Sequence, residues 1–144
     1  MEKEQIFEWM NRNMVFHLAT VENGEPRVRG MMLYKADETG IVFHTGAFKD
    51  VYKQIIAHPN VQMCFNDMEK GIQIRVRGRL EEVMDTDLKD EISNHPTRAF
   101  LKKLRESSPI EDFYDSIRVF RMKNGIANVW TFDANFAPKK DIQL

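Results

Sequence analysis

Short stretches in which apolar and polar residues alternate recur along the chain, separated by turn-forming residues. Alternation with a period of two places one face of a β-strand against a core. Residues 22–25 and 123–125 each contain an Asn-Gly pair, which favours a tight turn, and they predict a first and a terminal β-hairpin. Seven such strands predict a closed, antiparallel, Greek-key-like β-barrel. The strands are expected at residues 15–21, 27–34, 41–45, 61–65, 72–83, 116–122 and 126–132.

Between these strands lie segments in which apolar residues recur every three to four positions, as on one face of an α-helix. The segments are residues 2–13, 49–57, 85–93 and 97–105. The first is amphipathic and is expected to cap an open end of the sheet. The last is expected to have an apolar stripe of Phe100, Leu101 and Leu104. The fold class is therefore predicted to be mainly β with peripheral helices.

Length and charge limit the class of protein further. A chain of 144 residues builds one core of ordinary size, so one domain over residues 1–144 is expected. Lys and Arg total 21 against 22 Asp and Glu, and this balance gives no overall basic field to attract nucleic acid or an anionic membrane. The single cysteine, Cys64, cannot form an internal disulfide, and no apolar leader or spanning segment is evident. The sequence therefore predicts a cytoplasmic protein.

Several chemically capable side chains have a structural interpretation. His17 and His44 lie inside strand patterns without Cys, Asp or Glu at a ligand spacing, so they are interpreted as packed or surface imidazoles and no metal is expected. Cys64 lies in an apolar strand and is interpreted as an inert thiol. Arg75 and Arg77 point away from the apolar face of their strand and are interpreted as a solvated or ion-paired surface.

One loop has the composition of an anion-binding site. Residues 45–55 join an apolar strand to a helix through Thr45, Gly46 and Lys49. The hydroxyl and the ammonium are donors, and the free N–H groups of the first helical turn, together with the helix dipole, favour an anion there. Taken alone, Thr45 and Lys49 also fit a strand-end hydroxyl and a solvated lysine.

Two basic strands accompany this loop, at residues 27–34 and 73–78. Together the three segments predict a phosphorylated, partly apolar cofactor. Their order and spacing resemble the pyridoxamine 5'-phosphate oxidase-like family of FMN-binding split barrels, over nearly the whole chain. The loop matches the family's Thr-x-x-x-Lys spacing, and Gln73-Ile74-Arg75-Val76-Arg77-Gly78 is similar to the family's Gln-Val-Arg-Val-x-Gly strand.

The resemblance implies FMN as the cofactor and a homodimer that binds the flavin between its subunits. The phosphate needs cationic and N–H donors, and the ring system needs an apolar floor with hydrogen-bond partners at its edges. A glycine in the strand that passes the ring allows close approach of the backbone. The expected cofactor-binding residues are Arg29, Thr45 and Lys49 for the phosphate, and Gly30, Met31, Met32, Gln73 and Trp130 for the ring.

Some of these residues have a second interpretation. Met31 and Met32 also fit as core-filling side chains, and Trp130 also fits as an aromatic residue of the core or of a dimer interface. The sequence alone leaves both interpretations open.

The leading functional prediction is an FMN-dependent oxidoreductase that acts by hydride or electron transfer through the cofactor, without a protein nucleophile. Its substrate is not identified, and a small molecule or NAD(P)H is compatible with the site. The family's Arg-x-His segment is not found, so vitamin B6 oxidase activity is not expected. The alternatives are a flavin-binding or carrier protein without turnover, and a split barrel that holds haem or a deazaflavin.

Overall fold

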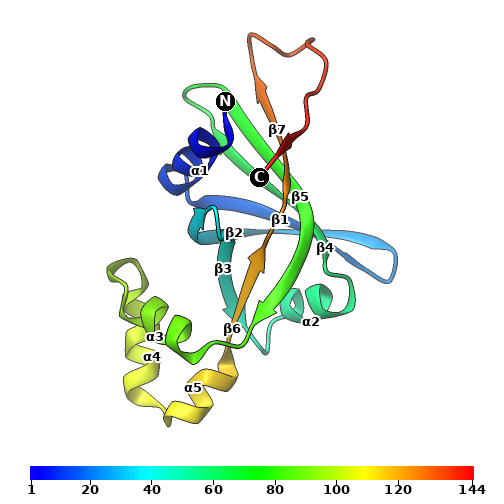
Figure 1. Cartoon of the computed structure of the whole chain (residues 1–144). Helices are drawn as coiled ribbons and strands as arrows, with labels where there is room; N and C mark the ends of the chain where they lie inside the picture. Colours follow the sequence, from blue (N-terminus) through cyan, green and yellow to red (C-terminus); the bar gives the residue numbers. More distant parts are fainter.

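The computed structural model describes all 144 residues and shows a β-barrel with helices beside it and at its ends (Figure 1). The helices are α1 (Lys3–Arg12), α2 (Asp50–Ala57), α3 (Thr86–Asn94), α4 (Ala99–Ser107) and α5 (Ile110–Ser116), with a 3-10 turn η1 (Pro96–Arg98) before α4. The strands are β1 (Val15–Glu22), β2 (Glu25–Asp37), β3 (Gly40–Gly46), β4 (Asn60–Asp67), β5 (Ile72–Val83), β6 (Ile117–Met122), β7 (Ile126–Thr131) and β8 (Ile142–Gln143).

Six strands close the barrel in the order β4-β1-β2-β3-β6-β5, because β5 also pairs with β4. All neighbouring strands are antiparallel. Strand β7 pairs with β5 outside this closed set, and the short β8 pairs with β7. The architecture confirms the prediction of a mainly β, closed antiparallel split barrel with peripheral helices.

The two Asn-Gly turns have different roles. Asn23 and Gly24 both have positive φ, and they join β1 to β2 as the predicted hairpin. The predicted terminal hairpin is wrong, because β6 and β7 do not pair with each other. Both pair with β5: Met122 lies opposite Leu80, and Ile126 lies opposite Arg77. The chain at 123–125 is therefore a step between two strands that follow one another along β5.

The barrel interior is filled by aromatic and aliphatic side chains. Phe16 stacks on Phe65 with ring centroids 5.0 Å apart and meets Phe43 edge-on at 5.6 Å. Helix α1 adds fully buried residues to the same cluster. Its Asn11 side chain donates to Ala36 O at 2.8 Å and accepts from Ala36 N at 2.9 Å, which fixes the helix to β2. The predicted capping helix is thus an integral part of the core.

Helices α3 to α5 follow β5 and precede β6 in the sequence. In space they form a separate layer at the lower end of the barrel in Figure 1. They have their own apolar cluster, which includes Ile92, Leu101 and Phe113. The helix α5 at 110–116 was not expected from the sequence, and neither was the short strand β8 at 142–143. The apolar stripe predicted for 97–105 is also wrong in part: Leu101 is buried, but Phe100 is 61% exposed and Leu104 is 44% exposed.

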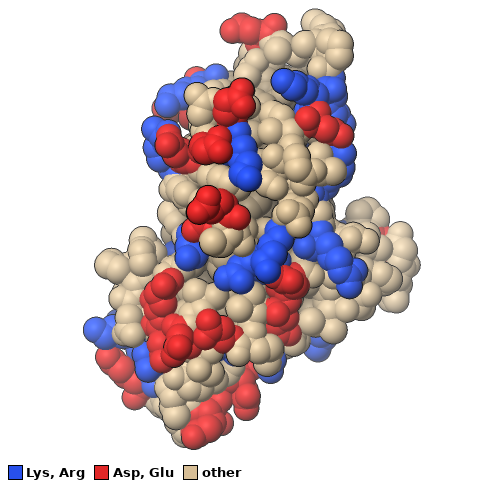
Figure 2. Space-filling model, in the orientation of Figure 1, with Lys and Arg blue, Asp and Glu red and all other residues tan.

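Charged side chains of both signs are interspersed over the face in Figure 2, and acidic residues gather over the part where α3 to α5 lie. No helix has both the length and the apolar character needed to cross a membrane.

Candidate functional site

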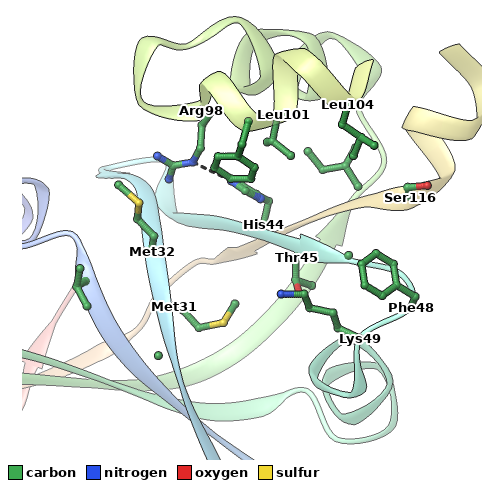
Figure 3. A pocket seen from close by; sticks show the side chains of 15 residues that line it. Met31, Met32, His44, Thr45, Phe48, Lys49, Arg98, Leu101, Leu104 and Ser116 are labelled. Carbon is green, nitrogen blue, oxygen red and sulfur yellow. Dashed lines mark hydrogen bonds between the residues drawn. The ribbon is translucent and has the colours of Figure 1, made fainter. Parts of the chain in front are cut away.

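A cavity of about 530 Å³ lies between strands β2 and β3 and helix α4 (Figure 3). Small-molecule sites in proteins have volumes of roughly 300 to 1,000 Å³, so this cavity is large enough to be one. Its lining comes from both layers of the molecule, and none of the lining residues is acidic. They are Val15, Gly30, Met31, Met32, His44, Thr45, Gly46, Phe48, Lys49, Arg98, Phe100, Leu101, Leu104, Ser116 and Ile117.

The turn from β3 into α2 brings the predicted anion-binding residues to one wall. Lys49 precedes α2 in an extended conformation, and its N–H donates to Gly46 O at 3.1 Å. Thr45 is buried near the end of β3, and Figure 3 shows the Lys49 ammonium extending toward it. The N–H groups that begin α2 carry the positive end of the helix dipole at the same place. Thr45 and Lys49 are thus together, as the sequence predicts.

A second, more open hollow of about 520 Å³ lies beyond Lys49 and shares Phe48 and Lys49 with the cavity. Arg29 lines this hollow, and its guanidinium is fixed by several acceptors. It donates to Thr20 Oγ1 at 2.7 Å, to Leu18 O at 3.1 Å and to Gln54 Oε1. Burial is the main cause that lowers the pKa of Arg29, and the guanidinium nevertheless stays charged at neutral pH.

Strand β2 forms a wall of the cavity in which the backbone at Gly30 is not covered by a side chain. A Cβ built on Gly30 would have no atom within 4 Å, so the space beside this glycine is open. Met31 is half-buried against the barrel core, and Met32 is 42% exposed. The three consecutive residues predicted to lie along a ring system therefore all line the cavity. Met31 also fills part of the core, as its second interpretation allows.

The structure does not bring Gln73 and Trp130 to the cavity. These residues lie opposite each other on β5 and β7. Gln73 donates to Asn66 Oδ1 at 2.9 Å, and Trp130 Nε1 donates to Asn135 Oδ1 at 2.9 Å. They form a separate polar and aromatic patch on the outer side of the barrel sheet. A ligand in the cavity of the same chain therefore does not have these two residues among its lining contacts.

The α4 end of the cavity contains a pair that the sequence did not indicate. Arg98 is completely buried, and its Nε donates to His44 Nε2 at 2.8 Å (Figure 3). Burial, Arg98 and Lys49 together lower the pKa of His44 to about 4, so this imidazole is neutral at pH 7. His44 is thus a cavity residue and not only a packed imidazole.

Sequence reasoning missed Arg98 and Phe48 as lining residues. Arg98 lies inside the helix predicted at 97–105, whose period gives it no special place, and it meets His44 only because η1 folds over β3. Phe48 could have been found from the sequence, since it is a large aromatic residue inside the loop at 45–55. In the structure it is 76% exposed.

The fold and the site together define a split-barrel protein with a ligand-sized cavity beside the β3–α2 turn. The family model described as pyridoxamine 5'-phosphate oxidase matches residues 2–119, and the chain belongs to this family. A curated relative, the pyridoxine/pyridoxamine 5'-phosphate oxidase of Brucella ovis, is 34% identical over 97 residues, which are 65% of this chain and 47% of the relative. The chain thus spans about half the length of the curated relatives it matches.

Solved structures share the fold over nearly the whole chain. A nimC/nimA family protein from Clostridium acetobutylicum has a TM-score of 0.75 at 21% identity, with 97% of this chain and 91% of that chain covered. A pyridoxamine 5'-phosphate oxidase-related, FMN-binding protein from Nostoc punctiforme has a TM-score of 0.69 at 15% identity, with 99% and 95% covered. At these identities the likeness shows the fold.

Proposed function

We propose that the chain binds FMN at this site, with the phosphate at Lys49 and the ring system along β2. The observation that carries the proposal is the position of Lys49 between two hollows. One hollow is mainly apolar, and the other is lined by Arg27, Arg29 and Lys49 against two carboxylates, Glu22 and Asp50, so its charged side chains are positive in sum. A flavin mononucleotide has the same division, with a planar ring at one end and a dianionic phosphate at the other.

The residues present fit this cofactor in two respects. The open space beside Gly30 leaves room for a planar group against the backbone of β2. Thr45 and the N–H groups at the start of α2 supply neutral donors next to the Lys49 charge, the combination that phosphate binding uses. Family membership and the FMN-binding relative from Nostoc punctiforme support the same cofactor.

We propose further that the protein is a flavin-dependent oxidoreductase. FMN supplies two-electron redox chemistry when it is bound, while the chain binds and orients it and keeps water away from one face. The cavity continues from β2 to α4, so a small substrate or NAD(P)H has room beside the proposed ring position. The oxidase activity of the curated relatives is not carried over, because the chain spans about half of their length.

A homodimer is the proposed assembly. Val28 on β2 is 68% exposed, and Val15 and Met32 at the rim of the cavity are 67% and 42% exposed. These neighbouring apolar side chains favour a protein partner over water. In this assembly the predicted flavin contacts of Gln73 and Trp130 would come from the partner copy.

The absorption spectrum of the purified protein, before and after addition of FMN, tests the cofactor. Bound flavin that is bleached by NADH or NADPH supports the oxidoreductase. Bound flavin that neither reductant changes favours a flavin carrier without turnover. A haem or deazaflavin spectrum would show that the protein holds that cofactor instead of FMN. A protein that stays colourless with excess FMN would refute the proposal.

Substitution of Lys49 by Ala tests the phosphate position. We expect FMN affinity to fall by roughly ten- to a hundredfold, because a hydrogen bond to a charged group contributes about 1.5 to 3 kcal/mol. Lys53→Ala is the matched control, since Lys53 is an exposed lysine of α2 that does not line the cavity. Fluorescence quenching of FMN measures both affinities. Equal affinity for the two variants would remove Lys49 from the site.

A further inference from the structure

The α4 end of the cavity contains a buried positive charge that no acidic side chain neutralises. Arg98 is 0% exposed and takes part in no ion pair of the chain. Its guanidinium donates to neutral acceptors: Leu33 O at 2.7 Å, Thr97 Oγ1 at 2.8 Å and His44 Nε2 at 2.8 Å. Buried charges in proteins are usually paired, since desolvation of an unpaired ion is costly.

The acidic residue in this neighbourhood is already engaged elsewhere. Glu91 accepts a hydrogen bond from Tyr34 Oη at 2.6 Å, and Arg98 Cζ lies over the Tyr34 ring, 5.7 Å from its centroid. No lining residue of the cavity is Asp or Glu. The cations that line it are Lys49 at one end and Arg98 at the other. The proposed FMN phosphate accounts for Lys49 and leaves Arg98 without an anion.

The hydrogen bond from Arg98 also fixes the form of His44. A nitrogen that accepts from a guanidinium carries no proton, so the neutral imidazole has its proton on Nδ1. No group of the chain accepts a hydrogen bond from His44 Nδ1. The atom is also not one of the fully buried polar atoms without a partner, so it is open to the cavity. Because His44 lines the cavity, Nδ1–H is available to a ligand there. Arg98 is thus a positioning residue for His44.

The remaining walls at this end are apolar. Phe100 and Leu104 of α4 are 61% and 44% exposed, although the period of the helix would place them on a core-facing stripe. Leu101 and Ile117 complete the same wall. The exposed side chains of Phe100 and Leu104, backed by Leu101 and Ile117 of the apolar cluster, favour a ligand with a flat, apolar body.

We propose that the α4 end of the cavity is a substrate subsite for a planar, largely apolar carboxylate, whose oxygen accepts a hydrogen bond from His44 Nδ1–H beside the Arg98 charge. The description of this ligand as a substrate rests on the proposed flavin function. Its binding to the protein does not, and can be measured with or without FMN.

A pair of probes that differ in charge tests the subsite. The probes are 2-naphthoate and its neutral counterpart 2-naphthamide, titrated by calorimetry into the FMN-free protein and into the FMN-loaded protein. In the loaded protein, the flavin absorption band gives a second readout. We expect naphthoate to bind at least tenfold more tightly than naphthamide in both forms. Equal affinities, or no binding of either probe, would overturn the proposal.

Variants of His44 locate the preference. His44→Phe removes both ring nitrogens and is expected to weaken naphthoate binding about tenfold while naphthamide binding changes little. His44→Gln keeps an acceptor for Arg98 and a donor for the ligand, so it should retain most of the preference. His58→Phe is the control at an exposed histidine away from the cavity. A carboxylate preference that survives in His44→Phe would overturn the role of His44.

Two further variants separate this end of the cavity from the phosphate end. Arg98→Met keeps the volume and removes the charge, and should lower the naphthoate affinity at least tenfold. If this variant does not fold, the probe pair and the His44 variants still decide the question. Lys49→Ala should leave the naphthoate preference of the FMN-free protein in place. If this variant loses the preference, the carboxylate binds at Lys49 and not at the α4 end. Failure to bind FMN with the preference intact would refute the flavin proposal alone.

Discussion

At Gly30, an effect on cofactor binding can be measured apart from an effect on stability. Gly30 lies in β2 opposite His17, without a positive φ, and the position of a Cβ is free of other atoms. The backbone there therefore accepts any residue that suits a strand. What a larger side chain would change is the space in the cavity, where the proposed ring system lies.

Substitution of Gly30 by Val should therefore reduce FMN affinity by at least about tenfold without lowering the free energy of unfolding, since Val favours strands over Gly by up to about 1 kcal/mol. Urea denaturation and FMN titration on the same preparation measure the two quantities. Gly30→Ala should have an intermediate effect on affinity. A Gly30→Val variant that retains FMN as tightly as the wild type would place the ring elsewhere.

His44 should make the stability of the protein depend on pH. The pKa of the unfolded residue is 6.5 and burial lowers it to about 4, so between these values the unfolded state binds more protons than the folded state. Stability is then complete above about pH 6.5 and decreases as the pH falls toward 4, by up to on the order of 3 kcal/mol. Urea unfolding at pH 7, 6 and 5 should show a steeper loss for the wild type than for His44→Gln. Parallel pH profiles would contradict the assignment.

Sequence reasoning grouped those lining residues of the cavity that are close together in the chain, while their role as a cofactor site stays a prediction. Thr45 and Lys49 belong to one turn, and Gly30, Met31 and Met32 belong to one strand, so local pattern was sufficient to group them. Arg98 and His44 are 54 positions apart and meet through the packing of η1 over β3. No local periodicity describes such a contact.

At the scale of elements, one buried polar side chain of α2 hydrogen-bonds the helix to the barrel, next to the apolar contacts of Val51 and Ile55. Gln54 is 5% exposed, accepts from Thr20 Oγ1 at 2.6 Å and from Arg29, and donates to Glu22 Oε2 at 2.7 Å. These contacts tie the helix to β1 and β2 just behind the proposed phosphate position. The orientation of Arg29 and the place of α2 therefore depend on the same amide.

Substitution of Gln54 by Ala should lower the free energy of unfolding by about 1 to 3 kcal/mol, because it leaves three polar groups without their partner. FMN affinity should fall as well, since Arg29 loses an acceptor. Gln62→Ala, at an exposed position of β4, is the control and should change stability by no more than about 0.5 kcal/mol. Chemical denaturation with paired FMN titrations tests both expectations. Identical results for the two variants would show that Gln54 does not anchor α2.

Helices and strands were predicted well where the local periodicity of the sequence determines them. They were predicted poorly where packing against other elements determines the path of the chain. The alternation of β1 to β6 and the helix of the β3–β4 connection follow from pattern. The path of the chain at 123–125 does not follow from pattern, because an Asn-Gly pair is compatible both with a hairpin and with a step between two strands along β5. Gly78 of β5 leaves room for the end of β6, since a Cβ there would lie 2.7 Å from Met122 Sδ.

At the scale of the whole molecule, the cavity lies at the seam between two layers, the barrel and the α3–α5 cluster. Its rim is apolar on the barrel side, and this surface is the one that the proposed homodimer would cover. The oligomeric state and the flavin site are therefore expected to change together.

Substitution of Val28 by Glu should convert the proposed dimer into a monomer and weaken FMN binding, because a charge at this exposed position of β2 would have to be buried against the partner. Ile56→Glu, at a 54% exposed apolar residue of α2 away from this rim, should leave the dimer intact. Sedimentation velocity gives the mass, and the flavin absorbance of each species gives its occupancy. A wild-type monomer that holds FMN normally would refute the proposed interface.

The position of α3 to α5 between β5 and β6 also governs the order of events during synthesis. A nascent chain that ends at Asp67 has β4 and β3 as the two open edges of a four-stranded sheet. Strand β5 reaches the β4 edge, but the β3 edge waits for β6, which the ribosome delivers only after residues 86–116. Pairings so distant in sequence form slowly, because loop closure costs entropy before the contact forms. Until then, co-translational folding leaves the β3 edge unprotected, at the strand that will later carry Thr45.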